Sequence, residues 1–182
     1  ISGHKGCVSG ALELGDFVRV EREVRACGRI AREVPTPYAR WWCAVLQASR
    51  ALIEGRLEVA EGRILESLQI AERVDAPEVA VEAMAQIAYL RTEQGRAHEI
   101  EASAREQVRR YPSQPTWRAA LARILLVSGQ AAEARRVIEP LVARRFEDIP
   151  IDRGWLATHA LSAEVVAATE DASAAEQLEL HL

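Results

Sequence analysis

The stretch Ala122-Arg-Ile-Leu-Leu-Val-Ser-Gly129-Gln-Ala-Ala-Glu-Ala134 decides how the rest of the chain is interpreted. A small residue, Ala122, precedes Gly129 by seven positions, and a second, Ala134, follows it by five. The residues between Ala122 and Gly129 are mostly apolar and favour a helix, while a glycine just past a helix takes the left-handed conformation that reverses the chain. The stretch therefore predicts two antiparallel helices that approach closely near a glycine turn.

The same spacing recurs at four further places in the chain. Three of these copies also have glycine at the turn, and the last has glutamate instead. The turn positions are Gly15, Gly55, Gly95, Gly129 and Glu170; the residues seven before them are Val8, Ala48, Ala88, Ala122 and Ala163, and those five after them are Val20, Ala60, Ile100, Ala134 and Ala175. Internal repeats of a helix hairpin indicate an array. We therefore expect an all-α fold with a turn at each of these five positions and no β-sheet.

The array resembles the tetratricopeptide family. Gly15-Asp16-Phe17 is similar to the inter-helix turn of that family, and the residues seven before and five after each turn match its close-contact positions. The turns are 40, 40, 34 and 41 residues apart, so one interval equals the family's repeat length. The resemblance implies a tetratricopeptide-like α-solenoid of about five antiparallel hairpins with irregular repeats.

The hairpins are expected within a single domain of 182 residues. Thr36 is a good helix N-cap before Pro37, and Asp75, Ser113 and Asp152 are predicted to cap later helices. Pro140 predicts a kink, or a short helix that restarts. The chain begins without methionine, so we expect a fragment of a longer array. The predicted hairpins cover residues 1–34, 37–74, 77–111, 114–146 and 152–182.

Composition narrows the classes of partner. The chain is 49% hydrophobic and 27% charged, with a net charge of −4, which makes nucleic acid an unlikely partner. No apolar run reaches the length of about 20 residues that a membrane span needs. Cys7, Cys27 and Cys43 are too few and too scattered for a disulfide framework or a metal site. We expect reduced, buried thiols and a cytoplasmic location without membrane attachment.

The C-terminal stretch Trp155-Leu-Ala-Thr-His-Ala-Leu-Ser-Ala-Glu-Val-Val-Ala-Ala-Thr-Glu-Asp-Ala172 is similar to a segment in the helical tails of large bacterial regulators. The regions around Arg40-Trp-Trp42 and Gly95-Arg96 resemble those tails as well. Such regulators join a signalling ATPase module to helical repeats and carry a LuxR-type DNA-binding domain or a class III cyclase domain at one end. Their catalytic motifs lie outside the repeat region.

The chain carries no recognisable catalytic motif. It has no Gly-x-x-x-x-Gly-Lys phosphate loop and no Gly-x-Ser-x-Gly elbow. His98-Glu99 opens like a zinc protease motif, but Ala102 stands where the second histidine is needed. We therefore expect no enzyme activity, no catalytic residue, no metal site and no cofactor.

Arginines gather on the predicted second helices of two hairpins. Arginines near the ends of helices compensate the helix dipole and form a solvated face, which explains this pattern. The alternative interpretation is a stripe that binds phosphate groups. The residues concerned are Arg105, Arg109, Arg110, Arg135, Arg136, Arg144 and Arg145.

In the tetratricopeptide family, first-helix residues at fixed distances before the turn line the inner, concave face. Mapping those positions here predicts a partner-binding row. Because Trp41 and Trp42 are adjacent on a helix, their side chains should diverge by about 100°, so we expect one in the core and the other along a groove. The alternative is that the irregular repeats bury Trp42 and Tyr89 as ordinary core. The predicted row is Trp42, Ser49, Tyr89, Arg123 and Glu164.

These observations predict a non-catalytic protein-interaction or effector-sensing repeat module of a bacterial signalling ATPase or transcriptional regulator. Its partner would be a protein segment, a neighbouring domain of the parent chain, or a small effector. The alternative is a structural spacer that binds no ligand and mediates only oligomerisation. A solenoid needs polar caps on its terminal repeats, and Leu178, Leu180 and Leu182 leave an apolar end that predicts a homodimer through the open ends.

Overall fold

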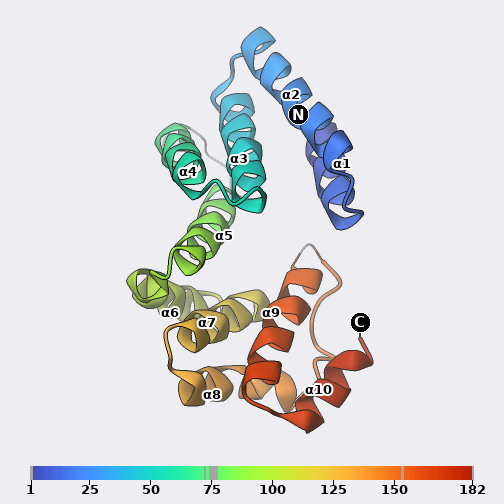
Figure 1. The fold of residues 1–182 in the computed structure, drawn as a ribbon, viewed down its shortest axis with the longest axis vertical. Coiled ribbons are helices and arrows are strands. Elements are labelled where there is room, and N and C mark those ends of the chain that lie inside the picture. Colours follow the sequence, from blue (N-terminus) through green and yellow to red (C-terminus); the bar gives the residue numbers. More distant parts are fainter. Residues whose placement is uncertain (1, 72, 74–77, 153, 182) are drawn as a thin grey trace. The chain divides into compact units, whose positions relative to one another are not determined.

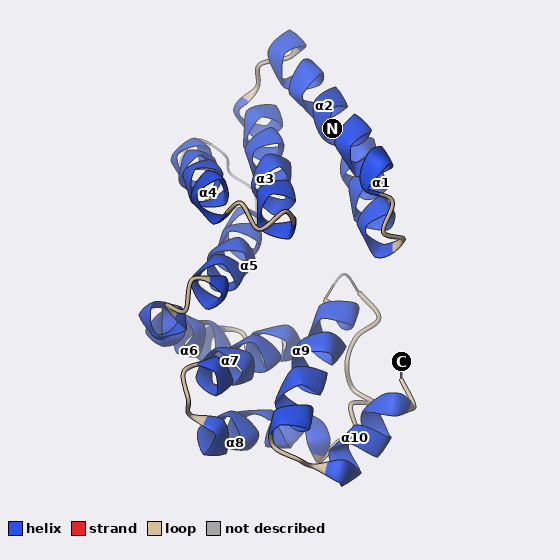
Figure 2. Cartoon of the chain, in the orientation of Figure 1, coloured by secondary structure: helices blue, strands red, loops and turns tan. Residues whose placement is uncertain are grey.

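The computed structural model of the protein describes residues 2–71, 73, 78–152 and 154–181. In these residues the chain forms ten α-helices and one short 3₁₀ helix, and no strand (Figure 2). The predicted all-α class is therefore confirmed. The elements are α1 (Ser2–Glu13), α2 (Phe17–Glu33), α3 (Pro37–Ile53), α4 (Leu57–Ala71), α5 (Glu78–Glu93), η1 (Ala97–Ile100), α6 (Glu101–Arg110), α7 (Pro115–Val127), α8 (Ala131–Val142), α9 (Trp155–Ala168) and α10 (Ala172–Glu179).

All five predicted turns lie between helices and share one hydrogen-bond pattern. In each, the turn residue donates its N–H to the carbonyl three residues back, and the next residue donates to the carbonyl five back, as in a Schellman motif. At the fourth turn these N···O distances are 3.0 Å from Gly129 to Leu126 and 2.9 Å from Gln130 to Leu125. The turn residues have positive φ in every case: Gly15 67°, Gly55 69°, Gly95 69°, Gly129 80° and Glu170 51°. The predicted turn positions are confirmed.

Glu170 is the one turn residue whose side chain disfavours this backbone conformation, since a left-handed φ brings Cβ close to the carbonyl oxygen. We expect Glu170→Gly to raise the free energy of unfolding by about 0.5–1 kcal/mol, and Gly129→Ala to lower it by a similar or larger amount. Urea unfolding followed by far-UV circular dichroism measures both. A loss of stability in Glu170→Gly would contradict the left-handed turn.

The residues flanking the turns are buried where helices approach closely. Ala48 and Ala60 are both 0% exposed, and so are Ala122 and Ala134. In the last hairpin the predicted Ala163 and Ala175 are half-buried, while Ser162 and Ala174, each one residue earlier, are 0% exposed. The predicted spacing therefore holds in these two hairpins and is displaced by one residue in the last, while in the third hairpin Ala88 is half-buried and Ile100 is buried.

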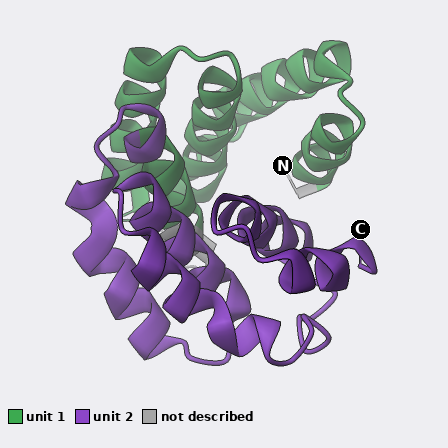
Figure 3. Cartoon of the chain, turned by 60° about the horizontal axis from the view of Figure 1, so that its bottom comes forward, with its two compact units in different colours: residues 1–90 green, residues 91–182 purple. Residues whose placement is uncertain are grey.

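The chain divides into two compact units, residues 1–90 and 91–182 (Figure 3). The sequence predicts a single domain, and the division between the units falls inside α5. In unit 1, α3 lies between α2 and α4, and α2 packs on α1 (Figure 1). The close-packed residues of α3 and α4 form one core cluster with Leu90 of α5. Helix α3 is thus the central element of unit 1.

In unit 2, α7 packs on α6, α8 and α9, and α10 packs on α9. Phe146, in the long connection before α9, joins Leu178 of α10 in one buried cluster. Leu178 is 3% exposed and Leu180 is 74% exposed, while Leu182 lies outside the described residues. The predicted apolar C-terminal end is therefore wrong for Leu178, which has core partners within its own unit, and applies to Leu180.

Of the predicted helix caps, Thr36 is confirmed, whereas Ser113 and Asp152 do not hold the N-cap position. Thr36 caps α3, because its hydroxyl oxygen accepts the N–H of Ala39 at 3.2 Å. Asp75 lies outside the described residues. Ser113 is not the cap that the sequence predicts, because α7 begins at Pro115 and its N-cap is Gln114. Asp152 does not hold the N-cap position of α9 either; Gly154 does, and the Asp152 carboxylate accepts the Gly154 N–H at 2.7 Å.

Pro140 lies inside α8, which ends two residues later at Val142. Proline has no N–H, so the Arg136 carbonyl loses its usual helical partner and the last turn of α8 is weakened. No second helix begins between Val142 and α9 in the part of this segment that the structure describes. Instead the chain turns through Arg145 and Phe146, whose φ values are 54° and 59°.

Candidate functional site

Trp42, the first residue of the predicted binding row, is in the core rather than on a groove. Its side chain is 2% exposed, and its ring centre lies 4.6 Å from that of Trp41. The ammonium of Lys5, from α1, lies 3.6 Å from the centre of the Trp42 ring. The sequence predicts one tryptophan in the core and the other along a groove. Both are buried, because α3 is flanked by α2 and α4. Trp42 is therefore not available to a partner.

Ser49 and Tyr89 lie in the same unit but have different environments. The Gln86 side-chain amide donates to the Ser49 hydroxyl at 2.9 Å and to the Val45 carbonyl at 2.8 Å. Ser49 therefore helps to join α3 to α5. Tyr89 is 45% exposed and is open to solvent.

Arg123 and Glu164 are the two residues of the row that the structure joins directly. The Arg123 Nε lies 2.6 Å from a Glu164 carboxylate oxygen, and Arg123 Nη2 lies 3.9 Å from Glu93. Both acids and Arg123 belong to unit 2, whereas Trp42, Ser49 and Tyr89 belong to unit 1. Arg123 on α7 therefore links the end of α5 to α9 through its two carboxylate partners.

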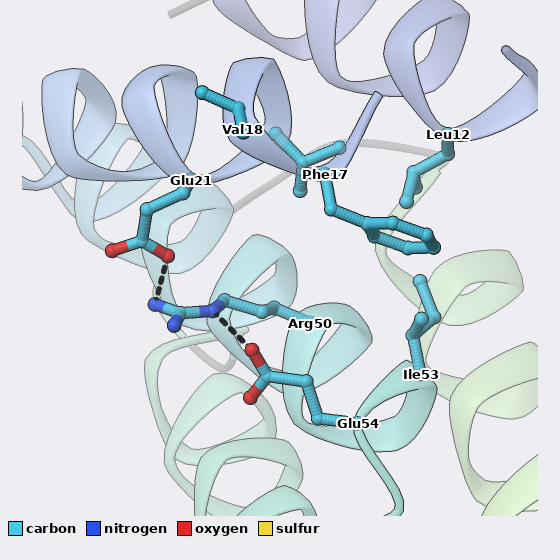
Figure 4. A pocket seen from close by; sticks show the side chains of 8 residues that line it. Leu12, Phe17, Val18, Glu21, Arg50, Ile53 and Glu54 are labelled. Carbon is cyan, nitrogen blue, oxygen red and sulfur yellow. Dashed lines mark hydrogen bonds and ion pairs between the residues drawn. The ribbon is translucent and has the colours of Figure 1, made fainter. Parts of the chain in front are cut away.

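A pocket of about 350 Å³ in unit 1 has the open apolar surface that the predicted row lacks (Figure 4). Phe17, the first residue of α2, lies between Leu12 of α1 and Ile53 of α3. Phe17 is 59% exposed, Ile53 46% and the neighbouring Val18 84%. The apolar residues next to the turns at Gly15 and Gly55 therefore meet at one end of the α1–α2–α3 packing. Their proximity to the turns is visible in the sequence, but which turn ends meet depends on tertiary packing.

The polar rim of this apolar pocket is a set of ion pairs centred on Arg50. Its guanidinium contacts Glu21 of α2 and Glu54, and the Nε to Glu54 distance is 2.9 Å (Figure 4). Arg56 also donates to Glu54, at 2.7 Å from Nε. Hydrogen bonds from Arg56 and Arg50 hold the pKa of the Glu54 carboxyl below its usual value. These pairs connect α2, α3 and the following turn around the apolar opening.

Among the described residues, the cysteines and the incomplete zinc motif have surroundings of their own. Within the described residues, no group of three or more His, Cys, Asp or Glu side chains is placed to hold a metal ion. Burial raises the pKa of both Cys27 and Cys43, which keeps these thiols protonated. Glu99, from the incomplete zinc motif, pairs with Arg96 at 2.7 Å. Across the same described residues, no helix has the length and apolar character required to cross a bilayer.

No protein-family model, curated protein or solved structure matches this chain. The resemblance to tetratricopeptide repeats and bacterial regulators therefore rests on the sequence motifs given above.

Proposed function

We propose that this chain is a non-catalytic protein-interaction module, and that the apolar pocket of unit 1 receives an apolar side chain of a protein partner. The supporting observation is that Phe17, Val18 and Ile53 are exposed around one pocket, beside the Arg50 ion pairs. An exposed apolar patch with a polar rim is typical of an interaction surface. Aromatic side chains such as Phe17 are enriched in the central contacts of interfaces.

The wider setting that we propose is a tetratricopeptide-like α-solenoid in the cytoplasm, within a bacterial signalling ATPase or transcriptional regulator. The five turns with one shared hydrogen-bond pattern support a repeat array. The sequence resemblance supports the class of parent protein. A partner in the pocket would contact α1, α2 and α3 together, and so would favour one arrangement of the first hairpin relative to the second. That preference is what the neighbouring domains would sense.

Selection from a library of displayed random peptides of about twelve residues tests this proposal. We expect enriched peptides to carry a large apolar residue and to bind the purified chain. The double substitution Phe17→Ser with Ile53→Ser should weaken that binding about tenfold or more, because it removes the central apolar contacts. Since neither side chain is buried in the core, helicity should be unchanged. Leu180→Ser, at a residue that is 74% exposed in unit 2, is the matched control and should bind normally.

Peptides that bind the double variant as tightly as the original chain would contradict the proposal. The alternative function, a structural spacer, has its own signature, because the same exposed apolar residues could meet a second copy. If selection yields no binding peptide and sedimentation shows a dimer that the double substitution dissociates, the spacer account is favoured instead.

A further inference from the structure

A second groove in unit 1, of about 500 Å³, shares Arg50 with the apolar pocket. Six of the ten residues that line it are arginine and none is acidic. We call it the arginine groove; its arginines are Arg25, Arg29, Arg32, Arg50, Arg56 and Arg63. It is separate from the arginine clusters on later helices that the sequence brought to attention.

Helical periodicity explains half of this lining. Arg25, Arg29 and Arg32 are four and then three residues apart on α2, so they share one face of the helix. Seven residues along an α-helix correspond to about 10 Å, which is the distance that the backbone of this row covers. Arg56, directly before α4, and Arg63, within α4, contribute to the same groove, as does Arg50 of α3. Three successive helices thus contribute guanidinium groups to one groove.

The nearby acids neutralise only part of this charge. Glu21 pairs with Arg25 and Arg50, Glu54 with Arg50 and Arg56, and Glu66 with Arg63, so that three carboxylates face six guanidinium groups. Within the described residues, the six arginines of the groove form no other ion pair.

Arg29 and Arg32 make no ion pair with any described residue, although they lie beside Arg25 in the same row. In a chain whose net charge is −4, this leaves a local excess of three positive charges in one groove. Like charges held close together destabilise a folded chain, so the fold itself gains nothing from this arrangement. An anionic ligand would offset the repulsion.

We propose that the arginine groove binds a carboxylate-rich segment of a protein partner. Guanidinium groups match carboxylates with paired, charge-assisted hydrogen bonds. Guanidinium groups from three successive helices line the groove, which suits several carboxylates along one peptide. The lining has no aromatic side chain on which nucleic-acid bases could stack. The inference rests on the proposed interaction function and adds the chemical class of the partner: an apolar anchor next to an acidic stretch, with Arg50 at the junction.

A fluorescein-labelled peptide of about twelve alternating Glu and Ala residues is the probe, and fluorescence anisotropy is the measurement. Arg29→Gln with Arg32→Gln removes two charges without breaking an ion pair seen in the structure. We expect this variant to raise the dissociation constant about tenfold or more. Arg19→Gln with Arg22→Gln is the matched control, because both residues are on α2 and outside the groove lining. The control should change the dissociation constant less than about twofold.

Three results would overturn the inference: no binding of the acidic peptide at low salt, equal losses in the two double variants, or tighter arginine-dependent binding of tripolyphosphate or a single-stranded RNA of equal charge. Because the probe lacks large apolar residues, the Phe17→Ser with Ile53→Ser variant should still bind it. Failure of the acidic probe, while apolar peptides are still selected, would leave the proposed function standing. If no apolar peptide is selected but the acidic probe still binds, the proposed role of the pocket fails and that of the arginine groove stands.

Discussion

Replacing Trp41 with alanine is expected to lower the free energy of unfolding of unit 1 by about 3–5 kcal/mol, the usual cost of emptying a buried tryptophan site. Trp41 is 0% exposed and packs with Trp42, Val45 and the end of α4 at Ile70 and Ala71. The loss is a large share of the roughly 5–15 kcal/mol that stabilises an ordinary domain. Urea unfolding followed by circular dichroism at the helix band measures it without relying on tryptophan fluorescence.

Tyr89→Ala is the control for an aromatic residue of unit 1 outside the core. Tyr89 is 45% exposed, so its replacement should cost less than about 1 kcal/mol. Equal losses at Trp41 and Tyr89 would show that the Trp41–Trp42 cluster does not stabilise unit 1 as a core cluster should. The groove predicted from the sequence at Trp42 would then have to be considered again.

Replacing Ala134 with leucine should destabilise unit 2 by about 1–3 kcal/mol, because the added carbons have no space. Ala134 is 0% exposed on α8, which packs on α7, where Ala122 is also 0% exposed. Ala131→Leu adds the same atoms at an exposed position of the same helix and should change stability by less than about 0.5 kcal/mol. Thermal unfolding of the two variants in parallel makes the comparison. Equal effects would contradict the role of Ala134 as a close-contact residue.

The turns could be predicted because each depends on local chemistry. Gly129 and its counterparts take a positive φ that few other residues tolerate, and the apolar spacing on either side is a property of a single hairpin. Glu170 could be predicted only from the repeat, since glutamate itself gives no turn signal. The N-cap at Thr36 was predictable for the same local reason. The prediction of Ser113 missed the N-cap of α7, Gln114, by one residue.

The binding surface was less predictable because it depends on how helices from different hairpins pack. The spacing of Trp41 and Trp42 gives their directions around α3 but not that both sides of α3 are covered. The row of Arg25, Arg29 and Arg32 is visible in the sequence as an i, i+4, i+7 pattern. The row forms a groove only together with Arg56 and Arg63 of the next hairpin, and their proximity depends on tertiary packing.

The most direct test of the central claim is to find where a peptide contacts the chain. A ¹H–¹⁵N NMR titration with the alternating Glu and Ala peptide, extended by one leucine, reports this residue by residue. The account predicts that the largest shifts fall in residues 12–32 and 47–63, together with the side-chain Nε signals of Arg29 and Arg32. Shifts confined to residues 91–182, or no shifts at saturating peptide, would contradict it.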